Sequence, residues 1–357
     1  MYLSTLKINQ FRNISQCDLS LNKHLNLISG LNGSGKTSII EAIYFLSMGR
    51  SFRSSQLARV IQHEQPDFNL FSELQTQAGK QIIALQKQRS GKGTVRLNHD
   101  NEKSHSALTK LLPVQLFNPE SLTLLKAGTQ QRCRLIDWGA FYSQPAFHQT
   151  WQSVKRLIKQ RNAALKQGYT SAMMLAWDQD LSDKSHILDQ QRKNYVEKLI
   201  PIIESLLKDF ISELSIEIEY TRGWVKGVEL IDLLKKNYEQ DKRFGITHHG
   251  PHRADLKIKS NGLPAQDILS RGQQKLFICM LKLAQGILFS TEHNTPCIYL
   301  VDDITSELDQ HFLAQFLDQL MSLKAQTFMT SIYEKDVQTF MSDIECRHFE
   351  IKNGMIP

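Results

Sequence analysis

Cysteine is scarce in this sequence, and long apolar runs are absent. No run approaches the roughly 20 apolar residues that would span a bilayer, and the first residues lack the basic and apolar regions of a signal peptide. Low-complexity tracts and internal repeats are also missing. We therefore expect a globular cytoplasmic protein with no membrane partner. The cysteines are odd in number, lie far apart and have no metal-ligand spacing, so we expect reduced thiols. They are Cys17, Cys133, Cys279, Cys297 and Cys346.

A concentrated block of basic residues is also lacking, although the formal net charge is +7. The basic side chains are dispersed along the chain. Such a balance is compatible with a polyanionic partner such as a nucleic acid, and equally with a slightly basic solvated surface.

With 357 residues, the chain is too long for one ordinary core, so we expect two domains or a large head with an insertion. The first 30 residues predict short strands, and strands are also expected at 82–85 and 95–97. From about 150 to 214 glycine is rare and apolar residues recur at helical intervals, which predicts two or three amphipathic helices interrupted at Gly168.

A glycine-rich segment near the N-terminus fits the phosphate-binding pattern G-x-x-x-x-G-K-[ST] at every fixed position. It follows the apolar run 25–28 and precedes a helical stretch, which is the context that this motif needs. Curled backbone N–H groups and the start of a helix attract phosphate. We expect Lys36 to reach the β- and γ-phosphates of ATP and the Thr37 hydroxyl to ligate Mg²⁺. The nucleotide-binding residues predicted here are Gly30, Leu31, Asn32, Gly33, Ser34, Gly35, Lys36, Thr37 and Ser38.

Two carboxylates near the other end of the chain are suited to complete this site. Asp302 and Asp303 follow the apolar run 297–301, which predicts a buried parallel strand. Carboxylates at the carboxyl end of such a strand face the ligand crevice. We therefore expect Asp302 to hold Mg²⁺ and Asp303 to polarise the attacking water, although an acidic pair can also simply cap a helix.

The segment Leu269-Ser270-Arg271-Gly272-Gln273-Gln274 precedes a predicted helix. Ser270 and Gln273 fit a helix capping box. The same residues resemble the signature loop of ABC-type ATPases, Leu-Ser-Gly-Gly-Gln. That resemblance implies that Ser270, Gly272 and Gln273 cap the γ-phosphate of ATP held by a second subunit. The segment 306–309 resembles the loop that lines the dimer seam in those ATPases.

Further motifs make the resemblance more specific. The chain is similar to the RecF family of bacterial recombinational repair proteins along its full length. The motifs are Phe11-Arg12-Asn13, Gly49-Arg50-Ser51-Phe52-Arg53, Gly250-Pro251-His252-Arg253-Ala254-Asp255-Leu256, Val301-Asp302-Asp303 and Ser306-Glu307-Leu308-Asp309. A further signature, 119–137, departs from the family pattern at Ala127, Thr129 and Cys133, which weakens any role for Arg132.

The resemblance places a γ-phosphate-sensing and metal-binding glutamine at Gln115, which could also be a solvated residue at a strand end. Transport ABC proteins carry glutamate where this chain has Asp303, and a switch histidine where 328–332 has none. A shorter base and no histidine predict slow hydrolysis that acts as a switch. The catalytic residues predicted for this weak ATPase are Lys36, Gln115, Asp302 and Asp303.

Other features allow simpler interpretations. His248, His249 and His252 are interrupted by Gly250 and Pro251, which disfavours zinc binding. The aromatic residues Trp151 and Trp177 are more often core than base-stacking platforms. Lys155, Arg156 and Lys159 share helical spacing and form either a DNA-contacting face or a solvated surface. Arg50, Arg53 and Arg161 are further candidates for DNA contact.

We therefore predict an α/β fold, an ABC-type P-loop ATPase head from residues 1–125 and 245–357, with a mainly helical second domain at 126–244. The RecF resemblance implies an ATP-dependent homodimer that binds single-stranded, gapped or junction DNA and works with RecO and RecR in loading RecA. A structural tether like the SMC proteins would need hundreds of coiled-coil residues, and an ATPase powering another complex would need rapid hydrolysis and a coupling surface.

Overall fold

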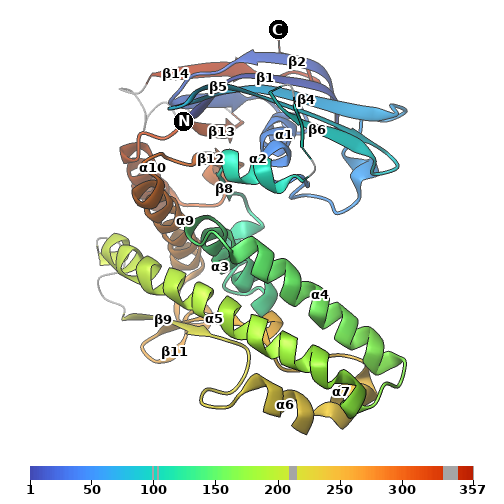
Figure 1. The fold of residues 1–357 in the computed structure, drawn as a ribbon. Coiled ribbons are helices and arrows are strands. Elements are labelled where there is room, and N and C mark those ends of the chain that lie inside the picture. Colours follow the sequence, from blue (N-terminus) through green and yellow to red (C-terminus); the bar gives the residue numbers. More distant parts are fainter. Residues whose placement is uncertain (99, 103, 209–214, 333–344, 357) are drawn as a thin grey trace. The chain divides into compact units, whose positions relative to one another are not determined.

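The computed structural model describes residues 1–98, 100–102, 104–208, 215–332 and 345–356 (Figure 1). Its contacts divide the chain into two compact units. We call Met1–Leu122 with Ile278–Pro357 the head unit, and Thr123–Phe277 the helical unit. Among the described helices, none is both long and apolar enough to cross a bilayer.

A five-stranded parallel sheet carries the predicted nucleotide motifs of the head unit. Its order is β14-β3-β13-β12-β8. Strands β3, β8, β12 and β13 are buried along their whole length, as expected for a parallel sheet covered on both faces, whereas the edge strand β14 is buried only at Phe349. Their bounds are β3 Leu25–Ser29, β8 Val114–Phe117, β12 Ile298–Val301, β13 Thr327–Ser331 and β14 Cys346–Glu350. The strand before the glycine-rich segment therefore lies between two strands from the far end of the chain.

A second sheet of the head unit is antiparallel, with the order β2-β1-β4-β5-β6-β7. Alternating burial along β4 shows that one of its faces packs on the core. The bounds are β1 Tyr2–Phe11, β2 Ile14–Ser20, β4 Asp67–Thr76, β5 Gly79–Gln88, β6 Gly93–Leu97 and β7 Asp100–Asn101. The strands expected at 82–85 and 95–97 are confirmed as parts of β5 and β6.

Helix α1 (Lys36–Met48) lies in the head core and is buried on almost all sides. Its Phe45 ring packs edge-on against Phe11 of β1 and Phe68 of β4, with ring centroids 6.2 and 5.1 Å away. Helices α2 (Ser106–Leu111) and α10 (Gln310–Ser322) complete this unit, together with the later part of α9 (Arg271–His293). The helix after the glycine-rich segment is thus held in place by core packing.

Helices dominate the helical unit, as the sequence predicts. They are α3 Thr129–Ser143, α4 Phe147–Lys166, α5 Ser171–Lys208, α6 Leu230–Lys236, α7 Tyr238–Phe244, α8 Ala265–Ile268 and the first turns of α9. The predicted break at Gly168 is confirmed, because this glycine has φ 78° between α4 and α5. A small antiparallel sheet has the order β11-β10-β9, with bounds Leu263–Pro264, Asp255–Ser260 and Ile216–Thr221.

Strand pairing decides how the middle of the chain groups in space. Strand β9 falls within the predicted insertion, 126–244, but it pairs in register with β10, which falls in the predicted head. Residues 245–277 therefore belong to the helical unit when the chain is divided into compact units. Whether that segment works functionally with the ATPase head stays a prediction.

Candidate nucleotide site

The glycine-rich segment forms a tight loop between β3 and α1. Gly30, Gly33 and Gly35 have φ values of 152, 80 and 119°, a region that L side chains rarely adopt. Helix α1 begins at Lys36, so the N–H groups of its first turn open toward the loop. The local backbone is therefore suited to an anion, and it forms where the sequence predicts a phosphate loop.

The Lys36 side chain folds back over this loop. Its Nζ donates to the carbonyl oxygens of Gly30 at 2.7 Å and Leu31 at 3.2 Å. Burial lowers the pKa of Lys36, whereas the charges of Asp303 and Asp302 raise it. The lysine is thus held by neutral carbonyls and lies within the field of both predicted carboxylates.

Asp302 joins three elements of the head unit. Its Oδ1 accepts hydrogen bonds from the Thr37 hydroxyl and the Thr330 hydroxyl, each at 3.0 Å. The residue is only 5% exposed, and burial raises the pKa of its carboxyl group, opposed by these two hydrogen bonds. The structure therefore brings Thr37 and Asp302 together, as the sequence predicts for two ligands of one metal ion.

Asp303 follows in a left-handed backbone conformation, with φ 56°. Its N–H donates to the Thr330 hydroxyl at 2.9 Å, and its carbonyl accepts from the Ser306 hydroxyl at 2.8 Å. Thr330 lies on β13, in the segment where the sequence lacks a histidine, and it fixes both aspartates. Sequence reasoning missed this threonine because nothing in its local pattern marks it.

Gln115 is not brought to Thr37 and Asp302. It lies inside β8, in register with Tyr299 of β12, and its Nε2 donates to Oε1 of Gln285 on α9 at 3.4 Å. Tyr299 precedes Asp302 by three residues, which is about 10 Å along a strand. The Asp302 N–H donates to the carbonyl of Phe117, the last residue of β8, at 2.8 Å; Asn118 follows, and its Oδ1 accepts from the Ser121 N–H at 3.0 Å.

Asn13 braces the phosphate loop from the turn between β1 and β2. Its Nδ2 donates to the Gly33 carbonyl at 3.1 Å, and its Oδ1 accepts from the Ser38 hydroxyl at 2.8 Å. One side chain therefore ties the loop to the first turn of α1. The motif Phe11-Arg12-Asn13 contained this residue, but its role needed the tertiary structure.

A turn near the C-terminus supports the same loop. The Gly354 N–H donates to the Ser34 carbonyl at 2.7 Å. Ile351 packs so closely that a Cβ at Gly30 would collide with its carbonyl oxygen, and one at Gly35 would lie 2.8 Å from its Cδ1. These two glycines are therefore required by close approach as well as by their φ angles.

Arg12 links two of the motifs that carry the family resemblance. Its guanidinium group donates to both carboxylate oxygens of Glu41 on α1, at 3.0 and 2.6 Å. Glu41 is fully buried and also accepts from the Ser51 hydroxyl, while Arg53 lies 3.5 Å from it. The motif at 49–53 is thus attached to α1 through one buried carboxylate.

In the helical unit, Ser270 and Gln273 form the predicted capping box at the start of α9. The Ser270 N–H donates to Gln273 Oε1 at 2.9 Å, and the Gln273 N–H donates to Ser270 Oγ at 3.2 Å. Ser270 is exposed and Gly272 is partly exposed. A capping box and an exposed anion-attracting helix end are therefore compatible in one segment.

The segment 250–255 is held by the buried Arg192 and the partly exposed Arg132. Arg192 donates to the Pro251 carbonyl at 2.7 Å, and Arg132 donates to both oxygens of Asp255 at 2.7 and 2.9 Å. The neighbouring histidines have protein partners as well: His248 Nδ1 lies 2.7 Å from Asp241, and His252 Nε2 lies 2.8 Å from the Thr247 carbonyl.

Comparison with known proteins identifies the family. A family model described as the RecF/RecN/SMC N terminal domain matches residues 2–354. The DNA replication and repair protein RecF of Francisella tularensis subsp. holarctica (strain FTNF002-00 / FTA) is 43% identical over 341 residues, covering 96% of this chain and 97% of that protein. The chain belongs to the RecF family. The protein of the same name from subsp. novicida (strain U112) is also 43% identical over 341 residues.

Solved structures agree with this membership in the RecF family. The structure described as the recombination mediator protein RecF-ATP in the RecFOR pathway matches with a TM-score of 0.89 and 26% identity, covering all of this chain and 97% of that one. An Smc head bound to the C-winged helix domain of ScpA matches with a TM-score of 0.59 and 14% identity, which supports the fold alone. The predicted ABC-type ATPase head is thereby confirmed.

Proposed function

We propose that this RecF-family chain is an ATP-dependent DNA-binding protein of replication and recombinational repair. The observation that carries the proposal is the 3.0 Å hydrogen bond between Thr37 on α1 and Asp302 after β12. It joins the phosphate loop to an acidic strand end from the other part of the chain. The RecF relatives named for DNA replication and repair, and the one solved with ATP, support the assignment.

In this proposal, ATP lies along the phosphate loop with Mg²⁺ beside it. The fit is chemical, because a hydroxyl and a carboxylate oxygen already meet at Thr37 and Asp302, and Mg²⁺ prefers oxygen ligands. Lys36 exchanges its carbonyl partners for the β- and γ-phosphates, and the N–H groups of the first turn of α1 face the same anion. Mg²⁺ neutralises part of the phosphate charge when bound.

Asp303 is the proposed group that orients the attacking water, and hydrolysis is proposed to be slow. The turn after β12 and the Thr330 hydroxyl hold its backbone, so its short side chain has limited reach. A slow step suits a switch that holds ATP and later releases it. Gln115 keeps a proposed role only if its strand or side chain rearranges when nucleotide binds.

ATP is proposed to join two copies of the chain. The γ-phosphate bound by one copy meets a segment of the other copy, formed by Ser270, Gly272 and Gln273. This segment lies at the N-terminus of α9, which attracts an anion. The dimer then binds single-stranded, gapped or junction DNA, and it works with RecO and RecR, which the RecFOR pathway of the solved relative favours.

Sedimentation with and without ATP, and with gapped duplex, tests this proposal. We expect the unchanged protein to dimerise only with ATP and then to bind the DNA. Ser270→Asp keeps a helix-capping side chain but places a negative charge against the phosphate, so it should bind ATP and stay monomeric. Ser270→Arg should also bind ATP and stay monomeric, because its large side chain would obstruct the contact between the two copies. A dimer that forms equally without ATP would overturn the mechanism.

A further inference from the structure

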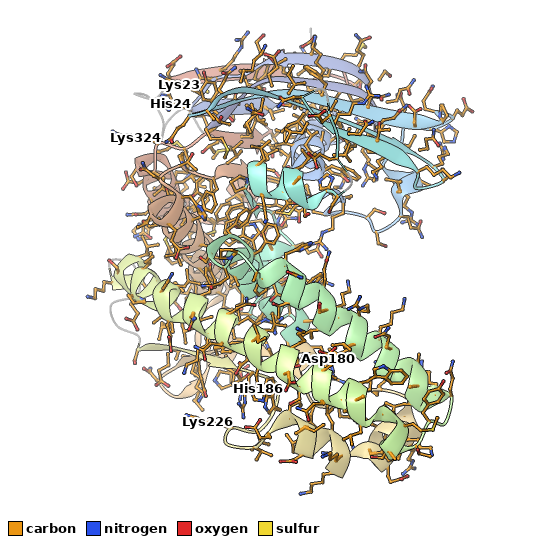
Figure 2. All side chains as sticks on the ribbon, in the orientation of Figure 1. Lys23, His24, Asp180, His186, Lys226 and Lys324 are labelled. Atoms are coloured by element: carbon orange, nitrogen blue, oxygen red, sulfur yellow. The ribbon has the colours of Figure 1, made fainter. Side chains whose placement is uncertain are left out.

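Helix α4 differs in charge from the helix that packs beside it. Its 20 residues contain five basic side chains and no acidic one. Helix α5 mixes acidic and basic residues, among them Asp180, which Figure 2 labels on that helix. A helix without acidic residues cannot neutralise its own cations by pairs along one face.

One of the five cations is used inside the unit. Arg161 is 1% exposed and donates to Asp178 at 2.8 Å and Asp241 at 2.6 Å. Lys155, Arg156, Lys159 and Lys166 are exposed instead. Within the described ranges of the chain, none of these four takes part in an ion pair.

Three of the exposed cations share a face. At 100° per residue, Lys155, Arg156 and Lys159 fall within about 100° of arc around α4, opposite its buried residues. Lys155 and Lys159 are one turn apart, which is about 6 Å along the axis. We call these three residues the α4 basic face. Because phosphates follow one another about every 3.4 Å of axis along a strand, cations at this separation can meet different phosphates of one strand.

The position of Lys155 is fixed from below. Its Nζ lies over the Trp151 ring, 4.9 Å from the centroid. The Trp151 indole N–H donates to Asp137 at 3.0 Å, and Asp137 is bound through both oxygens by the buried Arg192. These contacts hold the exposed Lys155 in place, and the carboxylate among them, Asp137, is already paired with Arg192.

We propose that the α4 basic face binds the phosphate backbone of DNA. The inference rests on the proposed DNA-binding function and adds the surface that nothing else assigns. Two lysines and an arginine that form no ion pair among the described residues attract a polyanion electrostatically and release its counterions on contact. Backbone contacts of this kind position the protein and carry no base specificity.

The test compares two triple charge reversals in full-length protein. One is Lys155→Glu with Arg156→Glu and Lys159→Glu; the control is Lys193→Glu with Lys235→Glu and Lys236→Glu, at exposed positions of the same unit. Both lower the net charge equally. With ATP, we expect the first to weaken binding to gapped duplex on the order of 10- to 100-fold and to lower the salt slope by about 0.9 for each duplex phosphate that the protein no longer neutralises. The control should stay within about threefold.

Further arms separate the outcomes. Lys155→Arg with Arg156→Lys and Lys159→Arg keeps the charge and should bind DNA normally. Weaker binding only to a 30-nucleotide single strand, or only to duplex, assigns the face to that form of DNA. ATP binding and thermal melting show that the variants are folded. Equal DNA affinity of both charge-reversal triples overturns this inference alone, whereas unchanged protein that fails to bind DNA with ATP overturns the proposed function as well.

Discussion

Buried charge is stabilised differently in the helical unit and in the nucleotide site of the head unit. In the helical unit, Arg161 and Arg192 are paired with aspartates at 2.6 to 2.8 Å. In the nucleotide site of the head unit, Lys36 is held by carbonyl oxygens and Asp302 by hydroxyl groups. Burial lowers the pKa of Lys36 and raises that of Asp302; it also raises the pKa of Asp178, where the Arg161 charge opposes it.

This difference in partners distinguishes charges that stabilise the fold from charges that are available to bind a ligand. Asp137 supplies a full opposite charge, so the pKa of Arg192 lies above its usual value although burial opposes this. Lys36 and Asp302 lack such direct partners, and their charged forms are disfavoured before a ligand arrives. Phosphate and Mg²⁺ would supply the missing opposite charges, so the free energy of burying these groups is recovered on binding.

The largest effect is expected when a structural pair is broken. Arg161→Met removes the guanidinium group that pairs with the buried Asp178 and Asp241, which should cost about 3–5 kcal/mol of unfolding free energy. Urea unfolding followed by tryptophan fluorescence measures it, because all four tryptophans lie in the helical unit. Adding Asp178→Asn and Asp241→Asn should restore much of the stability. A decrease below about 1 kcal/mol would contradict the comparison.

At the nucleotide site, we expect removal of a buried charge to raise the stability of the ligand-free protein. Asp302→Asn removes a charge that burial disfavours, so the ligand-free protein should melt a few degrees higher at pH 7. Because burial raises the folded pKa of Asp302 above 3.8, the folded state holds this proton more tightly, and the contribution of Asp302 to stability falls as pH rises from 3.8 through the folded pKa. The gain should therefore shrink toward that pH. The variant should also lose the extra stability that Mg-ATP gives; retention of it would remove Asp302 from the site.

The smallest effect is expected at the brace of the phosphate loop. Asn13→Ala removes two hydrogen bonds from an exposed side chain, which should cost about 1 kcal/mol in stability. ATP affinity should fall on the order of 10-fold, because the loop is no longer held in shape. Ser121→Ala, which removes the two hydrogen bonds that the Ser121 hydroxyl makes with the Asn118 backbone just after β8, serves as the matched control in a fluorescent-nucleotide titration. Equal decreases in both variants would reduce Asn13 to a general stabilising residue.

The sequence was sufficient for features whose chemistry is local. The phosphate loop, the strand ending at Asp302 and the capping box at Ser270 each need residues close together in the chain, and all three form as expected. The same holds for the break at Gly168, where a positive φ is required.

Features that depend on distant contacts could not be predicted in this way. Thr330 and Asn13 are ordinary polar residues until strand order places them beside Asp302 and Gly33. The pairing of β9 with β10, which groups residues 245–277 with the helical unit, left no local signal either. At Gln115 the family resemblance suggested a position at the site, but the β8 register puts it near Tyr299.

The order of strands around β3 also has a consequence for synthesis on the ribosome. Both neighbours of β3 in the parallel sheet, β13 and β14, come from the end of the chain, whereas the helical unit is one continuous segment. At typical elongation rates, β3 waits on the order of tens of seconds before its partners emerge. The helical unit can fold during that interval, while the apolar edge of β3 stays open to aggregation or to a chaperone.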